Sequence, residues 1–158
     1  MDKLLRLLSE NSSYSTKELA LIVGDTEENI IARIKEFERK GVIKGYRAII
    51  NWDAAEDTRV SAYIELKVTP KSETGFDEIA EQVMAFDEVS EVSLMAGTYD
   101  LGLTVKGDTI QDVSSFVSRK LSTLDGVLAT ATHFILKRYK YDSVVLSESS
   151  DDERCMQF

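Results

Sequence analysis

A short glycine-containing segment in the second half of the chain carries groups that suit a zwitterionic ligand. This segment is AGTYDLGLTVKG, residues 96–107, and the runs VSEVSLMAG and YDLGLTVKG predict two strands joined at Gly97. Gly97 permits a left-handed or very close backbone turn, so a carboxylate can approach main-chain N–H groups. Asp100 can accept hydrogen bonds from an ammonium group, and Tyr99 can wall a side-chain pocket, with Thr98 between the glycine and the tyrosine. The plainer alternative is a hairpin glycine and a turn-stabilising aspartate.

The chain offers little material for metal or nucleophile chemistry. It contains one cysteine, Cys155, and one histidine, His133. These counts exclude an intramolecular disulfide and a cysteine metal cluster, and leave little for a histidine-based site. No Ser-His-Asp set, metal-ligand spacing or phosphate loop indicates another chemistry. We therefore predict no catalytic residue, no metal and no cofactor other than a small-molecule effector.

Charge divides the sequence into two regions. Residues 1–50 carry nine Lys and Arg against eight Asp and Glu, whereas residues 51–158 carry ten against twenty. The net charge of −9 alone argues against a nucleic-acid partner, because DNA binding depends on Lys and Arg. The division into +1 and −10 instead indicates two domains with different partners. No apolar run has the length of a membrane span or the form of a signal peptide, so we expect a cytoplasmic protein with no membrane partner.

The first region predicts three short helices. Asp2 can cap the first, and Ser15 with Glu18 fits a capping box at the start of the second. The third begins after Thr26, a good N-cap, and follows a Gly24-Asp25 turn. Helices in this order form a helix-turn-helix arrangement.

After the third helix in the sequence, the run VIKGYRAII predicts a small β-wing. It contains two β-rich stretches broken at Lys44-Gly45. We place a winged helix-turn-helix DNA-binding domain at residues 1–50 and a polar linker at residues 51–59.

The second region alternates strand and helix patterns. A period of two predicts a strand at residues 60–68, and helical periodicity predicts two helices, the second capped by Asp108. A strand pair joined at Gly97 and a last strand at residues 127–141 complete the order β-α-β-β-α-β. This order is that of a ferredoxin-like domain, with two helices on one face of an antiparallel sheet. We place this domain at residues 60–142, and an acidic, disordered tail at residues 143–158.

The other face of that sheet stays open. Its contributors include Tyr63, Met95 and His133, which are less polar than a wet surface needs, so we expect a second subunit to cover it. Gly102 inside a strand indicates close approach of another backbone at the subunit interface.

Several short runs, each weak alone, occur here in a specific order and spacing. In the first half they are Glu18-Leu19-Ala20, Arg33-Ile34 with Glu38, and Gly41-Val42-Ile43 with Gly45-Tyr46. In the second half they are Gly97, Tyr99 and Asp100, then Gly126-Val127 and Thr132. Through these residues the chain resembles the Lrp/AsnC family, the feast/famine regulators, over about residues 2–142.

The resemblance implies an α+β protein that joins a winged helix-turn-helix to a ligand-sensing domain. It also implies a homodimer that assembles into a higher oligomer such as an octamer, binding to double-stranded DNA, and control by a small ligand, often an amino acid. Thr132 and His133 join the candidate effector contacts because the last strand runs beside the pocket in this family. A hydrogen-bonded packing residue is the alternative for His133.

The candidate DNA contacts include acidic residues at an unusual place. Asp25 stands where the family usually has an apolar residue, and Glu27 and Glu28 occupy the first turn of the recognition helix. One interpretation is local, since each acidic group near a helix N-terminus contributes about 0.3–1 kcal/mol. In the other, Glu28 accepts a hydrogen bond from a cytosine amino group and Asn29 addresses an adenine edge.

Basic residues complete the candidate DNA surface, to which Thr26 also belongs. Arg33 can reach a phosphate or pair with a carboxylate such as Glu36. The candidate phosphate contacts, each of which can also be a solvated surface charge, are Lys17, Lys35, Lys44 and Arg47.

Two other functions stay open. Some proteins that resemble this architecture are sirohaem decarboxylases, but a region of charge −10 with one histidine is a poor site for a porphyrin with many carboxylates. A helix-turn-helix that docks a protein instead of DNA is the second alternative, which the acidic residues Asp25, Glu27 and Glu28 favour.

Overall fold

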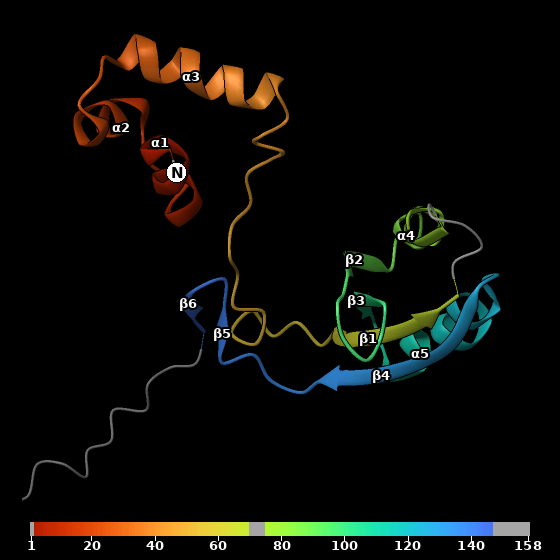
Figure 1. Cartoon of the computed structure of the whole chain (residues 1–158). Coiled ribbons are helices and arrows are strands. Elements are labelled where there is room, and N and C mark those ends of the chain that lie inside the picture. The colour runs from red at the N-terminus through yellow and green to blue at the C-terminus, as the bar shows by residue number, and fades with distance from the viewer. Residues whose placement is uncertain (1, 70–74, 147–158) are drawn as a thin grey trace, which may run out of the picture. The chain divides into compact units, whose positions relative to one another are not determined.

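The structure is a computed structural model that describes residues 2–69 and 75–146. The chain forms two compact units, residues 1–50 and residues 51–158, which are described separately (Figure 1). No helix in the described ranges has the length and apolar character needed to cross a membrane.

Three helices make up the first unit, and each begins at the cap predicted from the sequence. Asp2 accepts hydrogen bonds from two N–H groups of α1, Ser15 and Glu18 form the capping box of α2, and Thr26 caps α3. Gly24 ends α2 in the left-handed region at φ 81°. The bounds are Lys3–Glu10 for α1, Thr16–Val23 for α2 and Glu27–Arg39 for α3. The buried residues between them are Leu4, Leu7, Leu19, Ala20 and Ile30.

The structure contains no strand at residues 43–50, where the sequence predicts the wing. Tyr46, Ile49 and Ile50 in this segment are exposed. An isolated two-stranded hairpin is at best marginally stable, and it needs an apolar face packed against another element. The exposed apolar side chains of this segment do not provide such packing.

The second unit is a four-stranded antiparallel sheet with strand order β2-β3-β1-β4 (Figure 1). The alternate residues Ala62, Ile64 and Leu66 of β1 are fully buried against Val83 of α4 and Val113 of α5, so both helices cover one face. This confirms the ferredoxin-like α+β class. The bounds are Val60–Val68 (β1), Gly75–Met84 (α4), Val89–Leu94 (β2), Leu101–Gly107 (β3), Ile110–Arg119 (α5), Leu121–Thr123 (the 3-10 helix η1) and Val127–Ile135 (β4).

Element ends in this unit differ from the sequence prediction in two places. Thr109, not Asp108, caps α5, and it forms a capping box with Asp112. The last strand stops at Ile135 instead of residue 141, because Ser61 opposite Ile135 is its last partner on β1. A strand beyond that point would have no neighbour to bond with.

The chain after β4 forms a second, two-stranded sheet. Strand β5, Lys140–Tyr141, pairs with β6, Val144–Val145, so the start of the predicted disordered tail is ordered. The rest of that tail, residues 147–158, lies outside the described residues. The predicted linker also has structure, since Asp57 N–H donates to Trp52 O at 3.1 Å and Asn51 Nδ2 donates to Leu146 O at 2.8 Å.

Candidate functional site

The acidic residues before and at the start of α3 have partners within the first unit. Asp25 Oδ1 accepts hydrogen bonds from Thr26 N at 2.8 Å and from Asn29 Nδ2 at 2.7 Å. The bonds from Asn29 and then Thr26 lower the pKa of Asp25. Glu27 accepts a hydrogen bond from the Thr16 hydroxyl of α2. Asp25 and Glu27 therefore fasten the turn and the two helices together, and the Asn29 amide is already occupied.

Arg33 lies between two carboxylates that are far apart in the sequence. Its Nη2 donates to both Oδ atoms of Asp2 at 3.0 Å, and its Nη1 is 3.6 Å from Asp25 Oδ2. The predicted alternative partner, Glu36, is wrong, because Glu36 instead pairs with Arg39 and Lys40 on the last turn of α3. Local spacing favoured Glu36, whereas folding places Asp2 beside Arg33.

The same contacts act on the charge of Asp2. Burial disfavours its charged form, but hydrogen bonds from Leu4 N–H and Arg33 outweigh that effect, so its pKa falls below the ordinary value. The sequence signalled Asp2 only as a cap, and its second role needed the folded structure.

The remaining candidate DNA contacts of the first unit lie on its surface. Thr26 and Glu28 are exposed in and before the first turn of α3, although the Thr26 hydroxyl accepts a hydrogen bond from Asn29 N at 3.3 Å. The exposed basic candidates are Lys17, Lys35, Lys44 and Arg47. Glu28 thus remains the acidic side chain of this turn that is available for a partner.

The loop between β2 and β3 differs from its predicted geometry. Gly97 has no positive φ, so the predicted left-handed turn is wrong, and a Cβ on it would meet nothing within 4 Å. The reversal is spread over residues 95–100, and Met95 N donates to Asp100 O at 2.8 Å. A loop of this length does not need a positive φ. Gly97 and Thr98 are exposed in it.

Asp100 fastens this loop to the sheet. Its Oδ2 accepts a hydrogen bond from Val68 N at 2.8 Å, and its own N–H donates to Leu66 O at 2.9 Å. This is the turn-stabilising arrangement considered for the sequence. One carboxylate oxygen is thus committed to the end of β1.

Tyr99 packs against a second tyrosine on the open sheet face. The hydroxyl oxygens of Tyr63 and Tyr99 are 2.8 Å apart, and the rings meet edge to face at 6.3 Å. The hydrogen bond with Tyr99, together with burial, raises the pKa of Tyr63 to about 12. A Cβ on Gly102 would lie 2.1 Å from the Tyr63 hydroxyl oxygen. The prediction of a second backbone at Gly102 is therefore wrong, because a side chain of the same subunit fills that space.

The two candidates on β4 lie on opposite faces of the sheet. Thr132 pairs with Ile64, whose side chain is in the core, whereas His133 pairs with Tyr63 on the open face. His133 Nε2 is 3.4 Å from Glu65 Oε1. Glu65 was not selected from the sequence, although the alternation along β1 places it on the same face as Tyr63. The structure thus groups Tyr63, Tyr99, Glu65 and His133 on the open face, and Thr132 apart from them.

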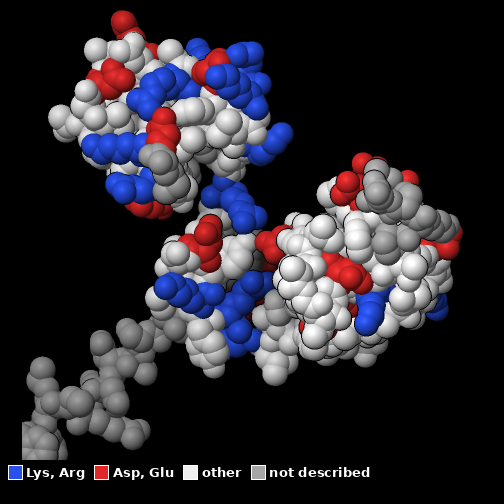
Figure 2. Space-filling model, in the orientation of Figure 1, with Lys and Arg blue, Asp and Glu red and all other residues white. Residues whose placement is uncertain are grey.

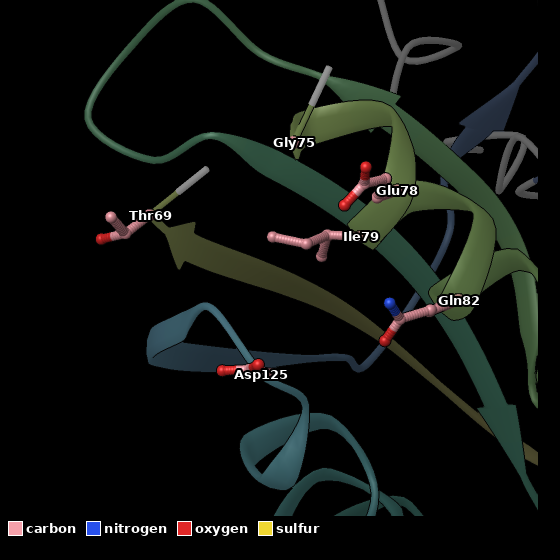
Figure 3. A pocket seen from close by; sticks show the side chains of 6 residues that line it. All are labelled: Thr69, Gly75, Glu78, Ile79, Gln82 and Asp125. Carbon is pink, nitrogen blue, oxygen red and sulfur yellow. The ribbon is translucent and has the colours of Figure 1, made fainter. Parts of the chain in front are cut away.

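A small pocket of the second unit lies between α4, the residue after β1 and the turn before β4 (Figure 3). Its lining residues are Thr69, Gly75, Glu78, Ile79, Gln82 and Asp125. None of the six predicted effector residues lines it. In the described part of the chain, no group of three or more His, Cys, Asp and Glu is placed to hold a metal ion.

Comparison with known families decides the class of the protein. Residues 61–145 match the Lrp/AsnC ligand binding domain, and residues 3–44 match the winged helix-turn-helix DNA-binding domain. The chain belongs to the Lrp/AsnC family. It is therefore a DNA-binding transcriptional regulator with a ligand-binding domain.

Similar Lrp/AsnC proteins match along nearly their whole length. The Bacillus subtilis protein named uncharacterized HTH-type transcriptional regulator YugG is 43% identical over 153 residues, 96% of this chain and 92% of its own. The leucine-responsive regulatory protein of Haemophilus influenzae is 27% identical over 138 residues, 87% of this chain and 82% of its own. Both are named as regulators.

Solved structures share the fold. An AsnC family transcriptional regulator from Agrobacterium tumefaciens is 27% identical, with a TM-score of 0.68 over 89% of this chain and 94% of its own. A transcriptional regulator from Neisseria meningitidis, solved as a complex with L-methionine, is 24% identical, with a TM-score of 0.70 over 89% of this chain and 93% of its own.

Proposed function

We propose that this Lrp/AsnC regulator reads specific double-stranded DNA with α3 and adjusts that binding in response to an amino acid. The contacts of Asp25 with Asn29 and of Glu27 with Thr16 carry the first part of the proposal. They remove from the recognition surface two of the three acidic groups that opposed a DNA partner. The surface that remains combines exposed Glu28 with the exposed basic candidates Lys17, Lys35, Lys44 and Arg47. Arg33 is partly exposed and pairs with Asp2.

For the effector, the proposed contacts are Gly97, Thr98, Tyr99, Asp100 and His133. Thr132 is left out, because it lies on the opposite face of β4. The exposed Gly97-Thr98 backbone supplies N–H donors for a carboxylate, and the second Asp100 oxygen can accept from an ammonium. The L-methionine complex of the Neisseria protein supports an amino acid as the ligand class.

The assembly that we propose is a homodimer through the open sheet face, and an octamer of four such dimers. Ala131 and His133 on β4 are exposed on this face, and Tyr63 is half-buried. An uncovered face of this kind on a sheet is typical of a subunit interface. Because an effector can shift only an equilibrium between states that bind it differently, its site at a subunit boundary would couple ligand binding to assembly.

The test is fluorescence anisotropy of the purified chain with its own upstream DNA and with a scrambled duplex, at several salt concentrations, with and without mixed amino acids. We expect tighter binding to its own DNA, an affinity that falls steeply with salt, and a change on adding amino acids. The absence of both sequence preference and salt dependence would overturn DNA binding and favour a protein partner for α3. DNA binding that no amino acid changes would overturn only the effector class.

A further inference from the structure

A basic hairpin follows β4 in a unit whose overall charge is acidic. We use this name for residues 137–146, which include β5 and β6. Three of the ten Lys and Arg of residues 51–158 fall within four consecutive positions of it, Lys137, Arg138 and Lys140. Figure 2 shows Lys and Arg side chains gathered over the region of β5 and β6. This concentration is a local departure from the acidic character of the unit.

The cations of the basic hairpin have no carboxylate partner among the described residues. Other cations of the same unit do, since Arg59 pairs with Asp57 and Lys120 with Glu88. Unpaired cations grouped this closely repel one another, so the group is stabilised when an external polyanion approaches. Its charge therefore suits a partner that carries several negative groups in a row.

Two of these cations make cation–π contacts with tyrosine rings of the same hairpin. Lys137 Nζ lies 5.2 Å from the centre of the Tyr139 ring, and Arg138 Cζ lies 5.3 Å from the centre of the Tyr141 ring. Such contacts are attractive and reduce the freedom of the side chain. Tyr139 is itself 65% exposed, so it can contact a partner together with Lys137.

The backbone of the hairpin is fixed as well. Asp142 and Ser143 both have a positive φ, 45° and 67°, as a tight two-residue hairpin turn requires. Leu146 N donates to Tyr139 O at 2.9 Å, and Leu146 O accepts from Asn51 Nδ2 at 2.8 Å. Asn51 directly follows Ile50, the last residue of the first unit. The basic hairpin is thus fastened at the point where the chain enters from the DNA-binding unit.

We propose that the basic hairpin binds the phosphate backbone of DNA, as a second contact outside the helix-turn-helix. The inference rests on the proposed DNA binding of the first unit. A duplex held by that unit is the regular polyanion available to a hairpin attached at Asn51, and ring-held cations on a fixed hairpin suit evenly spaced phosphates. Lysine contacts of this kind carry no base information, so they strengthen binding to all sequences alike.

The test compares two double variants of the full chain that lose the same charge. Lys137→Gln with Lys140→Gln removes two hairpin cations and keeps Arg138 on its ring. Lys106→Gln with Arg119→Gln removes two exposed cations from the end of β3 and the end of α5. Anisotropy at several salt concentrations gives the slope of log affinity against log salt for each variant, and circular dichroism melting checks that each is folded.

We expect the hairpin variant to lose about 0.9 from that slope for each phosphate contact removed, hence up to about 1.8 for each bound chain. Its affinity should fall equally for its own DNA and for the scrambled duplex, and the control variant should keep the slope of the unaltered protein. Equal slopes for the two variants would overturn the inference while leaving DNA binding by α3 intact. If the unaltered protein binds no duplex, both proposals fail.

Discussion

Arg33 is a single side chain that links three segments of the first unit. It contacts Asp2 at the start of α1 and Asp25 in the turn before α3. We expect Arg33→Leu to lower the Tm of this unit by a few degrees in circular dichroism melting, because it leaves two half-buried carboxylates without their cation. Arg39→Leu is the control, since Glu36 would keep Lys40 as its partner. Equal Tm values for the two variants would contradict this role of Arg33.

The same cluster predicts a pH dependence. The pKa values of Asp2 and Asp25 are lowered from 3.8 in the folded chain. A lowered folded-state pKa contributes stability that is present above the unfolded value and is lost as pH falls through the folded one. The Tm difference between the unaltered chain and Arg33→Leu should therefore be full near pH 6 and shrink below about pH 3.8. A difference that stays constant across an acid series would contradict the contribution of these two carboxylates.

Gly102 is a position where a single methyl group has a defined neighbour. A Cβ there would lie 2.1 Å from the Tyr63 hydroxyl oxygen, so the tyrosine must move. We expect Gly102→Ala to lower the free energy of unfolding by about 1–3 kcal/mol in urea titrations, as overpacking does. Gly97→Ala is the matched control, because it meets no atom within 4 Å and has no positive φ. A cost of the same size at both glycines would show that Tyr63 is not the cause.

At the scale of the elements, the sequence predicted what depends on neighbours within one helical turn. The caps Asp2, Ser15 and Thr26 involve residues two or three positions away, so their signal is local. The wing was not predictable in the same way, since a hairpin forms only if something covers its apolar face. The stop of β4 at Ile135 likewise depends on where β1 begins, which the sequence of β4 does not contain.

In the candidate effector site, too, the local features were predictable from the sequence and the long-range contacts were not. The alternation along β1 and β4 was enough to place Tyr63 and His133 on one face. The geometry of Gly97 was not predictable, because it depends on how the whole loop from Met95 to Asp100 closes. The contact of Asp100 with Val68 joins positions 32 residues apart and follows from the pairing of β1 with β3.

The start of α5 offers a test at the scale of one element. Thr109 Oγ1 accepts a hydrogen bond from Asp112 N at 3.1 Å, and Asp112 Oδ2 accepts one from Thr109 N at 2.9 Å. We expect Thr109→Ala to cost about 0.5–2 kcal/mol of unfolding free energy in urea titrations. Asp108→Ala should change it by less than about 0.5 kcal/mol, since Asp108 is not the cap. The reverse order of the two costs would restore Asp108 as the cap.

For the whole molecule, the proposed dimer makes the open sheet face the most sensitive surface. Ala131 is exposed on β4 opposite Glu65. An arginine at position 131 would place a second long charged side chain beside Glu65 in the proposed dimer interface. We expect Ala131→Arg to shift the protein to smaller species in sedimentation velocity. The control Ser114→Arg, at an exposed position of α5, should leave the size of the assembly unchanged. An unchanged sedimentation coefficient for Ala131→Arg would place the subunit contact elsewhere.

The hydrogen bond from Asn51 to Leu146 has a consequence for engineering. It brings the two ends of the described part of the second unit to one place, 2.8 Å apart at the bonded atoms. A folded unit whose ends are adjacent can be inserted into a surface loop of another protein without stretching the host, and its own ends can be moved to one of its loops. The adjacent ends of residues 51–146 therefore suit the transfer of this unit into a host protein without long added linkers.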